Sequence, residues 1–304
     1  MAARPRPYAD ADLHRLRGAV GAWIAEVGRC AYDHVGQIPR RIYGTPRLGL
    51  PVGDRVQVWE DADGAVVGLA INLRFGVAFD VFAAPAVRGT VLERGMVEAT
   101  YRTMGRMLAP GEPFVLTDVF DCDEVRAALL TDLGFARFRV WDEVEERSLE
   151  SVPPITELAP GFTVRAARTS DANGLAAVRN GTIDDEGQWT GPLYRSQVME
   201  KPGYEPSREI VAVTTDGRVV AFTQYWIDAA NGMGQFSPVG THPDYRRRGL
   251  ARAVMVTAMH RMREEGMRTV TVSHDAENTP ATRLYRSLGL EKRHETLGYR
   301  RPRP

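Results

Sequence analysis

The chain has 304 residues, of which 43% are hydrophobic and 26% are charged, with 39 basic and 39 acidic side chains. These values are typical of a globular protein with one or two domains. The balanced charge produces no global field that would favour nucleic acid or an anionic membrane as a partner. Cys30 and Cys122 are too few for a disulfide framework and have no metal-ligand spacing, so we expect no metal site and a reducing compartment. The first ten residues lack the apolar core of a signal peptide, and no apolar run is long enough to cross a bilayer. We therefore expect a cytoplasmic protein.

The first half of the chain alternates helix and strand signals. Leu13, Leu16, Val20, Ile24 and Val27 keep helical spacing and predict a first helix. Residues 36–53, rich in Gly, Pro and Arg, are predicted to form a loop. Further on, strands are predicted at 55–60, 65–75, 77–83, 114–120 and 137–146, and helices near 97–108 and at 123–133.

The second half repeats this order after a proline-rich linker at 149–160. A strand at 162–167 and a helix at 170–180 precede the acidic stretch 184–187 and a second helical segment near 193–200. Strands then follow at 208–214, 219–227, 233–241 and 268–274, with a long helix after Gly249 and another after Asn278.

Landmarks of the two halves recur at a nearly constant spacing. Arg88 and Arg246 are separated by 158 residues, Asp63 and Asp216 by 153, and Gly134 and Gly289 by 155. A constant offset across independent features predicts an internal duplication. We therefore expect a domain at 1–148, the linker at 149–160 and a second domain at 161–304.

The clearest functional signal lies between the strand that ends near Thr241 and the long helix after Gly249. Arg246, Arg247 and Arg248 place positive charge at this junction, and Gly249, Leu250 and Ala251 open the helix. A helix N-terminus offers backbone N–H groups and the positive end of a dipole, which together bind phosphate. The small residues Gly249 and Ala251 allow close approach of an anion.

The spacing Arg246-x-x-Gly249-x-Ala251 resembles the acyl-CoA signature of the GNAT superfamily of N-acetyltransferases. A second segment is similar to the later motif of that family, with Asn278, Ala281, Leu284, Tyr285 and Gly289 at the family's spacing. Either pattern alone is a modest signal, whereas both in this order are specific. The resemblance covers most of residues 161–300 and implies an α/β (α+β) fold, in which a mixed, mostly antiparallel sheet is flanked by helices. With the duplication, it implies two tandem GNAT folds.

The resemblance also implies a set of roles. Val239, Gly240 and Thr241 would present strand backbone to the pantetheine arm of acetyl-CoA, and residues 246–251 would hold its pyrophosphate. Asn278 and Ala281 would contact the cofactor, and Tyr285 would be the general acid for the departing thiolate. Two of these positions also have plain structural interpretations, because Tyr285 lies on the apolar stripe of its helix and Asn278 stands at a capping position.

The general base is not identified by the sequence. Supplying a neutral alkylamine at pH 7 costs about 4.6 kcal/mol, and many GNAT enzymes carry a carboxylate on the strand where this chain has Gln235 and Ser237. His274 is the candidate catalytic residue that remains near the site, although a lone histidine is more often structural. The acidic residues Asp184, Asp185 and Glu186 are further candidates.

The first copy is expected to be degenerate. Aligning Arg88 with Arg246 puts Val91 in the place of Gly249 and Glu93 in the place of Ala251. A branched side chain and a carboxylate in these places would keep a phosphate away.

We therefore predict an N-acetyltransferase that moves an acetyl group from acetyl-CoA to a primary amine of a small molecule, without a metal. Neither nucleic acid nor a membrane is an expected partner. The alternative is a non-catalytic acyl-CoA-binding or regulatory module.

Overall fold

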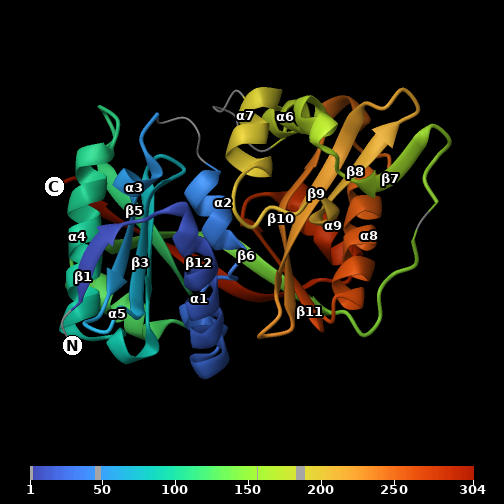
Figure 1. Cartoon of the computed structure of the whole chain (residues 1–304). Coiled ribbons are helices and arrows are strands. Elements are labelled where there is room, and N and C mark those ends of the chain that lie inside the picture. The colour runs from blue at the N-terminus through green and yellow to red at the C-terminus, as the bar shows by residue number, and fades with distance from the viewer. Residues whose placement is uncertain (1–2, 45–48, 156, 183–188) are drawn as a thin grey trace. The chain divides into compact units, whose positions relative to one another are not determined.

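The computed structural model describes residues 3–44, 49–155, 157–182 and 189–304, and the chain divides into two compact units. Unit 1 comprises residues 1–144 together with 293–304, and unit 2 comprises residues 145–292. Figure 1 shows both units, coloured along the chain. The predicted division differs in two respects: the boundary falls inside a strand rather than in the linker, and the last twelve residues of the chain belong to unit 1. Sequence patterns do not record which sheet a strand joins, so the second difference had no signal in the sequence.

Unit 1 is built on a mostly antiparallel sheet. Its strands have the order β1-β2-β3-β4-β5-β12, and β4 and β5 are the parallel pair. Its elements in chain order are β1 (Arg4–Pro7), η1 (Asp10–Asp12), α1 (Leu13–Val27), η2 (Arg29–Ala31), α2 (Gln37–Tyr43), α3 (Val52–Arg55), β2 (Val56–Glu60), β3 (Val66–Arg74), β4 (Ala78–Ala83), η4 (Pro85–Val87), α4 (Val91–Met107), β5 (Phe114–Phe120), α5 (Glu124–Asp132), most of β6 (Ala136–Ser148) and most of β12 (Glu291–Pro302).

Unit 2 repeats the same architecture. Its sheet has the order β11-β10-β9-β8-β7, with the end of β6 beside β11 and a single parallel pair formed by β10 and β11. Its elements are β7 (Phe162–Ala166), η5 (Thr169–Asp171), α6 (Ala172–Asn180), α7 (Gly191–Tyr194), η6 (Arg195–Met199), η7 (Pro206–Arg208), β8 (Glu209–Thr214), β9 (Val219–Asp228), β10 (Met233–Thr241), η8 (Pro243–Tyr245), α8 (Leu250–Glu264), β11 (Thr269–Asp275) and α9 (Thr279–Ser287). The mixed, mostly antiparallel strand order within each unit confirms the predicted fold class.

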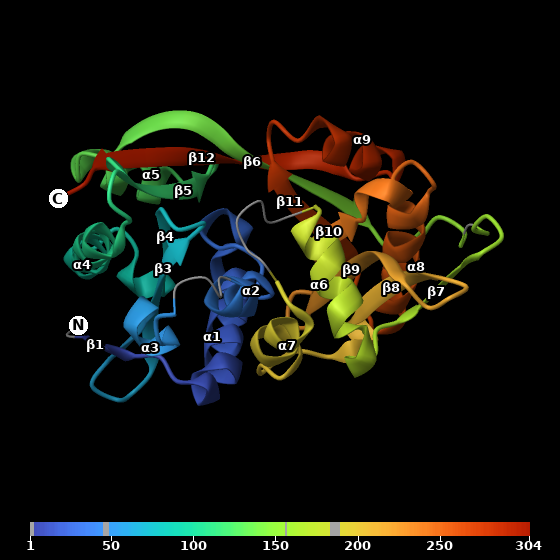
Figure 2. The ribbon, with the colours of Figure 1, turned by 90° about the horizontal axis from the view of Figure 1, so that it is seen from above.

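Strand alternation gives the sheet of unit 2 two apolar faces. On β8, Ile210 and Ala212 pack with α8 and α9, whereas Val211 and Val213 pack with α6 and α7. This is the consequence of side chains pointing to opposite sides at successive positions. Figure 2 shows α6 and α7 apart from α8 and α9. The sheet of unit 2 is therefore covered by helices on both faces.

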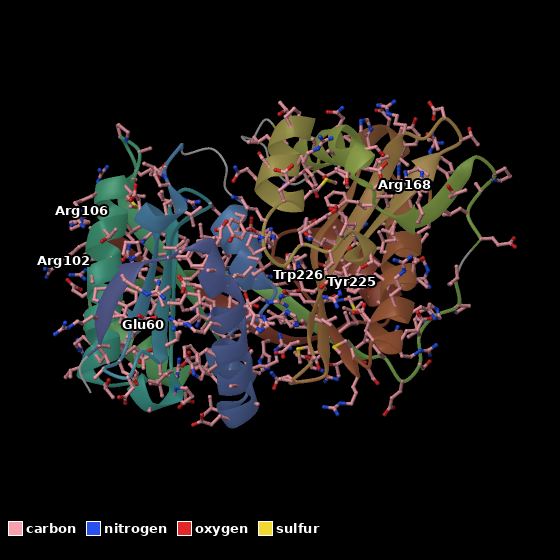
Figure 3. All side chains as sticks on the ribbon, viewed as in Figure 1. Glu60, Arg102, Arg106, Arg168, Tyr225 and Trp226 are labelled. Atoms are coloured by element: carbon pink, nitrogen blue, oxygen red, sulfur yellow. A yellow bond between two sulfur atoms is a disulfide. The ribbon has the colours of Figure 1, made fainter. Side chains whose placement is uncertain are left out.

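In unit 1, α4 shows why its sequence forms an amphipathic helix. Met96, Val97 and Met104 are buried against the sheet, and Thr90 caps the first turn by accepting a hydrogen bond from the Leu92 N–H. The opposite side carries exposed arginines, of which Arg102 and Arg106 are labelled in Figure 3. The helical spacing of these hydrophobic residues is why the sequence predicted a helix here.

The predicted loop at 36–53 contains a helix, which is a correction. Residues 37–43 form α2, and Ile38 and Ile42 are fully buried, four residues apart on one face. Pro39 lies in the first turn, where its missing N–H breaks no helical hydrogen bond. The Gly and Arg content of this stretch predicted a loop, whereas the burial of Ile38 and Ile42 stabilises a short helix.

The two cysteines, expected to be reduced, form a disulfide in unit 1. Cys30 and Cys122 have Cα atoms 5.4 Å apart and close a loop with a sequence separation of 92. Cys30 lies on η2 and Cys122 just after β5. Their distance along the chain is why no local cysteine pattern predicted the pairing. Within the described ranges, no helix has both the length and the apolar character that crossing a bilayer requires.

Candidate active site

β10 and β11 are parallel neighbours whose pairing stops halfway along the strands. The ladder runs from Met233 opposite Thr269 to Phe236 opposite Val272 and ends there. β10 continues through the cis Ser237–Pro238 peptide bond to Thr241, and its register against β9 shifts between Phe236 and Val239. A bulge of this kind bends a strand and redirects the residues beyond it. The C-terminal ends of β10 and β11 are thus separated, as the family resemblance implied.

The junction after β10 has the geometry of an anion-binding helix start. Gly249 caps α8 in the left-handed conformation, with φ of 75°, and no side chain caps this end. The three arginines before it are exposed, and the guanidinium of Arg246 donates a hydrogen bond of 3.1 Å to the carbonyl oxygen of Gly181. Uncapped N–H groups at a helix start satisfy the requirement for binding phosphate.

Two glycines of the predicted site are required for different reasons. A Cβ on Gly249 would meet nothing within 4 Å, so the positive φ is what favours glycine there. A Cβ on Gly240 would lie 2.8 Å from the Thr182 hydroxyl and 2.9 Å from the Phe222 ring. Gly240 is therefore explained by close packing inside unit 2.

α9 brings the later motif to the separated strand ends. Asn278 caps this helix by accepting a hydrogen bond of 3.2 Å from the Ala281 N–H, which gives Asn278 the structural role that its position allowed. Tyr285 is buried, with 6% of its surface exposed, and its ring centroid lies 5.2 Å from that of His274 on β11. The structure thus brings the two predicted catalytic residues together.

A third residue, Glu145 on β6, joins Tyr285 and His274. Its side chain is fully buried, and its Oε1 lies 3.9 Å from His274 Nε2 and 3.5 Å from Arg286 Nε. Burial, and then the charge of Glu145, raise the pKa of Tyr285 above its usual value. The sequence analysis missed Glu145 because β6 is rich in polar residues and belongs to the other half of the predicted duplication.

The first copy fills the same region with its own side chains. Glu93, fully buried at the start of α4, accepts a hydrogen bond of 2.5 Å from the Gly89 N–H in the loop that corresponds to residues 246–249. Arg126 on α5 donates to Glu93 and, over 3.0 Å, to the backbone oxygen of Val81. With the offsets of 158 and 155 residues, Val81 corresponds to Val239 and Arg126 to Ala281. In the first copy, a carboxylate thus fills the loop and a guanidinium binds the strand backbone.

One detail of the predicted alignment is corrected by the helix starts. α4 begins at Val91 after Thr90, and α8 begins at Leu250 after Gly249, so Thr90 rather than Val91 corresponds to Gly249. By the same register, Glu93 corresponds to Arg252 rather than to Ala251. The loop of the first copy is one residue shorter. Val91 is 86% exposed and blocks nothing, so Glu93 is the residue that fills this loop.

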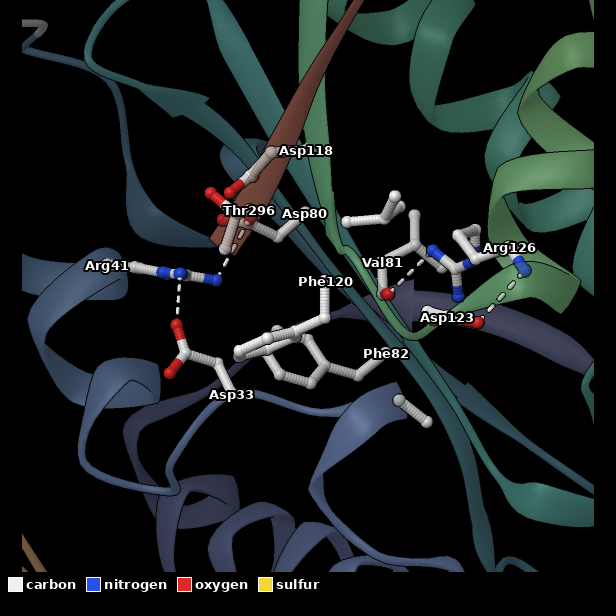
Figure 4. Close-up of a pocket in the computed structure, with 12 residues that line it drawn as sticks. Asp33, Arg41, Asp80, Val81, Phe82, Asp118, Phe120, Asp123, Arg126 and Thr296 are labelled. Atoms are coloured by element: carbon white, nitrogen blue, oxygen red, sulfur yellow. Dashed lines mark hydrogen bonds and ion pairs between the residues drawn. The ribbon is translucent and has the colours of Figure 1, made fainter. Parts of the chain in front are cut away.

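Unit 1 also contains a pocket at the point where β4 and β5 separate (Figure 4). Arg41 bridges Asp33 at 2.5 Å and Asp80 at 3.0 Å, and Arg74 pairs with Asp80 and Asp118. Burial raises the pKa of Asp80; for Asp118 the charges of Arg74 and Arg41 outweigh burial and lower the pKa. Each of the three carboxylates is paired with at least one guanidinium, so we assign the cluster a structural role. Charged residues inside apolar strand sequences were the signal for it.

Elsewhere in unit 2, Glu209 on β8 makes stability depend on pH. It is fully buried and accepts hydrogen bonds from the hydroxyls of Tyr194 and Tyr204. Burial raises its pKa from 4.5 to about 6, against the opposing effect of the two tyrosines. The folded state therefore binds this proton more tightly than the unfolded state. The contribution of Glu209 to stability should fall as pH rises through this range, by about 2 kcal/mol in total.

Urea-dependent hydrogen exchange of peptides from β8 and β9, in the wild type and in Glu209→Gln at pH 4.5 and pH 7, checks this. The difference in unfolding free energy between the two proteins should change by about 1.6 kcal/mol between the two pH values, because half of the unfolded chains are still protonated at pH 4.5. Glu265→Gln is the control, because Glu265 also accepts from a tyrosine, Tyr225, but is partly exposed. A difference that is equal at both pH values would contradict the prediction.

Other residues named from the sequence lie near the loop or on β10. Gln235 and Ser237 are buried on β10, and Thr241 and Ala251 are partly buried beside the loop. The acidic residues 184–186 lie outside the described residues.

Comparisons with known proteins agree with this geometry. Residues 178–290 match the Acetyltransferase (GNAT) family. A mycothiol acetyltransferase of Thermomonospora curvata is 29% identical over 183 residues, which are 59% of this chain and 60% of that protein. A second one, of Clavibacter michiganensis, is 24% identical over 91% of this chain and 90% of its own.

Two solved structures resemble the whole chain. A GCN5-related N-acetyltransferase from Sphaerobacter thermophilus superimposes with a TM-score of 0.62 and 25% identity, over 99% of this chain and 96% of its own. A tandem GNAT protein from the clavulanic acid biosynthesis pathway has a TM-score of 0.65 at 15% identity, over 100% and 99% of the two chains. Residues 178–290 thus match the GNAT acetyltransferase family, and the chain as a whole has the fold of the tandem GNAT protein.

Proposed function

We propose that this protein is an acetyl-CoA-dependent N-acetyltransferase that acts on a primary amine of a small molecule, with unit 2 as the catalytic unit. The observation that carries the proposal is the uncapped start of α8, with three exposed arginines, at the end of a strand pair that separates beside Tyr285. Acetyl-CoA has a pyrophosphate for the first feature and an extended pantetheine arm for the second.

The same site suggests where each part of the cofactor would lie. Residues 246–251 would hold the pyrophosphate, and the backbone of Val239, Gly240 and Thr241 would face the pantetheine amides. Ala281 leaves room in unit 2 where the corresponding Arg126 of unit 1 reaches strand backbone. Asn278 would contribute by holding the start of α9 in place.

The reaction requires a neutral amine, a polarised carbonyl and a proton for the thiolate. The amine nitrogen attacks the thioester carbon, and a backbone N–H near Val239 would stabilise the developing oxyanion. The C–S bond then breaks, and the hydroxyl of Tyr285 gives its proton to sulfur. β10 supplies no carboxylate as a base, since Gln235 and Ser237 occupy the relevant positions.

Calorimetry with CoA tests the cofactor site. Gly249→Val should raise the dissociation constant of CoA at least tenfold, because a β-branched residue cannot easily adopt a φ of 75° and the loop would change shape. Gly217→Val is the matched control: Gly217 has a φ of 84°, also with open space around its Cβ, but lies in the turn between β8 and β9. Equal weakening by both variants, or no CoA binding by the wild type, would refute the site.

The acceptor is to be found with a panel of small amines, assayed by release of CoA. The curated relatives are named mycothiol acetyltransferases, so their acceptor belongs in the panel. A non-catalytic acyl-CoA-binding module would bind CoA and turn over none of the amines.

A further inference from the structure

The disulfide of unit 1 has a histidine and a carboxylate beside it. Nδ1 of His294 lies 3.5 Å from Sγ of Cys122 and 3.2 Å from Oδ1 of Asp121. One ligand atom from each of Cys30, Cys122 and His294 lies within 4.8 Å of the other two. Cysteine sulfur, imidazole nitrogen and carboxylate oxygen are the atoms that bind zinc in proteins. Once the disulfide is reduced, this group therefore contains the donor atoms of a zinc site.

The separations of these atoms are those of ligands around one tetrahedral ion. With Zn–S, Zn–N and Zn–O bonds of about 2.3, 2.05 and 2.0 Å, a tetrahedral angle puts sulfur and nitrogen about 3.5 Å apart, and nitrogen and oxygen about 3.3 Å apart. The contacts of His294 with Cys122 and Asp121 agree with both values. A hydrogen on Nδ1 points well at only one of these two neighbours, whereas an ion bonded to Nδ1 can bind both.

The sheet, rather than the disulfide, holds three of these residues in place. β12 pairs with β5, and just beyond the paired strands the Asp121 N–H donates a hydrogen bond of 2.9 Å to the carbonyl oxygen of Glu295. The ring of His294 packs edge-on against Phe120, with the ring centres 5.9 Å apart. Asp121, Cys122 and His294 should therefore keep their positions when the S–S bond is broken.

Cys30 is anchored independently, on η2. The buried Tyr32, two residues later, donates from its hydroxyl to the Ala83 carbonyl oxygen over 2.6 Å, and its N–H donates to the Arg29 carbonyl oxygen over 3.0 Å. Cys30 thus stays near Cys122 without the covalent bond. Rotation of the Cys30 side chain can separate the sulfurs from about 2.05 Å, as in a disulfide, to about 3.8 Å, as for two thiolates on one zinc ion.

The group is accessible, and its donor atoms are selective. The side chains of His294 and Asp121 are 31% and 38% exposed, so an ion can reach them from solvent. Two thiolates and an imidazole favour zinc over magnesium or calcium, which prefer oxygen ligands. The sequence predicted no metal because these ligands come from three segments that are far apart along the chain, with no short spacing between the cysteines.

We propose that Cys30, Cys122, His294 and Asp121 bind a zinc ion when the disulfide is reduced, so that the ion replaces the disulfide as the link between η2 and the end of β5. A dithiol supplies the electrons: its thiolate attacks a cysteine sulfur, the S–S bond breaks, and the dithiol closes to its own disulfide while two cysteine thiols form. Zinc then displaces the two thiol protons. This inference concerns unit 1 and does not depend on the proposed function.

Cobalt(II) tests the site in the full chain, without an affinity tag. The disulfide is reduced with a phosphine, which is removed under argon, and Co²⁺ is added as a spectroscopic substitute for zinc. We expect one ion per reduced chain, with the near-ultraviolet band of a thiolate–cobalt bond and the visible bands of tetrahedral Co²⁺. Zn²⁺ should displace the cobalt with a dissociation constant below about 1 µM. The oxidised chain should show neither band.

Single variants identify the ligands. Cys122→Ser leaves one thiolate, so it should roughly halve the ultraviolet band per bound ion and weaken Co²⁺ binding at least tenfold. His294→Gln and Asp121→Asn should each weaken binding about tenfold and keep the band of both thiolates at saturating metal. His14→Gln and Asp132→Asn are the matched controls, because both side chains are exposed and lie outside the group, and binding should be unchanged. Binding that neither Cys122→Ser nor His294→Gln weakens overturns the proposal.

The comparison of the two redox forms needs no variant, so it decides the matter even if a variant does not fold. A reduced wild type that binds no Co²⁺, or binds it without the thiolate band, overturns the proposal. Hydrogen exchange of peptides from η2 and β12 gives a second measurement. Zn²⁺ should slow this exchange about tenfold in the reduced chain and leave the oxidised chain unchanged. Equal exchange with and without Zn²⁺ in the reduced chain contradicts the link.

Discussion

Replacing Tyr285 with phenylalanine should lower kcat at least 100-fold while CoA affinity stays within twofold of the wild type. The reason is that the hydroxyl is the proposed proton donor to the thiolate, and positioned acids contribute about 10²–10⁴-fold to such reactions. The ring itself remains, so its packing against His274 and the core of unit 2 is retained. Steady-state kinetics by CoA release, with calorimetry of CoA binding on the same samples, measures both quantities.

Tyr225→Phe is the matched control for this experiment. Tyr225 is also a buried tyrosine of unit 2, and its hydroxyl donates to Glu265 over 2.7 Å, away from β11 and α9. Its loss should change stability slightly and kcat by less than twofold. If Tyr285→Phe retained full turnover, the general acid would have to be another group, and a protein that binds CoA without turning over any amine would be a sensor.

Replacing Glu93 with glutamine should destabilise unit 1 by about 3–5 kcal/mol, the usual cost of removing one partner of a buried ion pair. Arg126 is 6% exposed and would keep its charge in the interior, without the carboxylate that accepts from its Nε and Nη2. The amide also loses the charge that caps the Gly89 N–H. Because the chain has two units, the measurement is urea-dependent hydrogen exchange of peptides from α4, α5 and β4.

Two variants separate this effect from a general loss of charge. Asp132→Asn removes a carboxylate from an exposed pair with Arg94 in the same unit and should cost less than about 1 kcal/mol. The double replacement Glu93→Leu with Arg126→Met removes both charges and should recover much of the loss. If Glu93→Gln cost no more than Asp132→Asn, the pair could not be what fills the first copy.

Local patterns were enough to predict the repeated fold and to define most of the candidate site. Gly249 and Tyr285 were identified because each motif lies within one turn and one helix, where spacing alone fixes which residues meet. The duplication was visible for the same reason, since landmarks such as Gly134 and Gly289 close equivalent helices, with φ of 79° and 78°.

Partners distant in sequence had no comparable signal. Glu145 is 129 residues before His274, and Glu93 meets Arg126 from a different helix. The Cys30–Cys122 pairing and the assignment of β12 to unit 1 depend on the same kind of long-range contact. Burial decides these pairings, and burial is a property of the folded chain. The short helix α2 was not predicted for a related reason: its sequence is helical only in the context that buries Ile38 and Ile42.

The place of β12 has a consequence for how the protein is made. β12 pairs with the whole length of β5, from Thr296 opposite Phe120 to Pro302 opposite Phe114. During synthesis on the ribosome, the amino-terminal half emerges first but cannot complete its sheet until β12 has been translated. Unit 2 is complete in sequence sooner, so a nascent chain would carry an open strand edge on β5 throughout, and messages that stop early would yield a product prone to self-association.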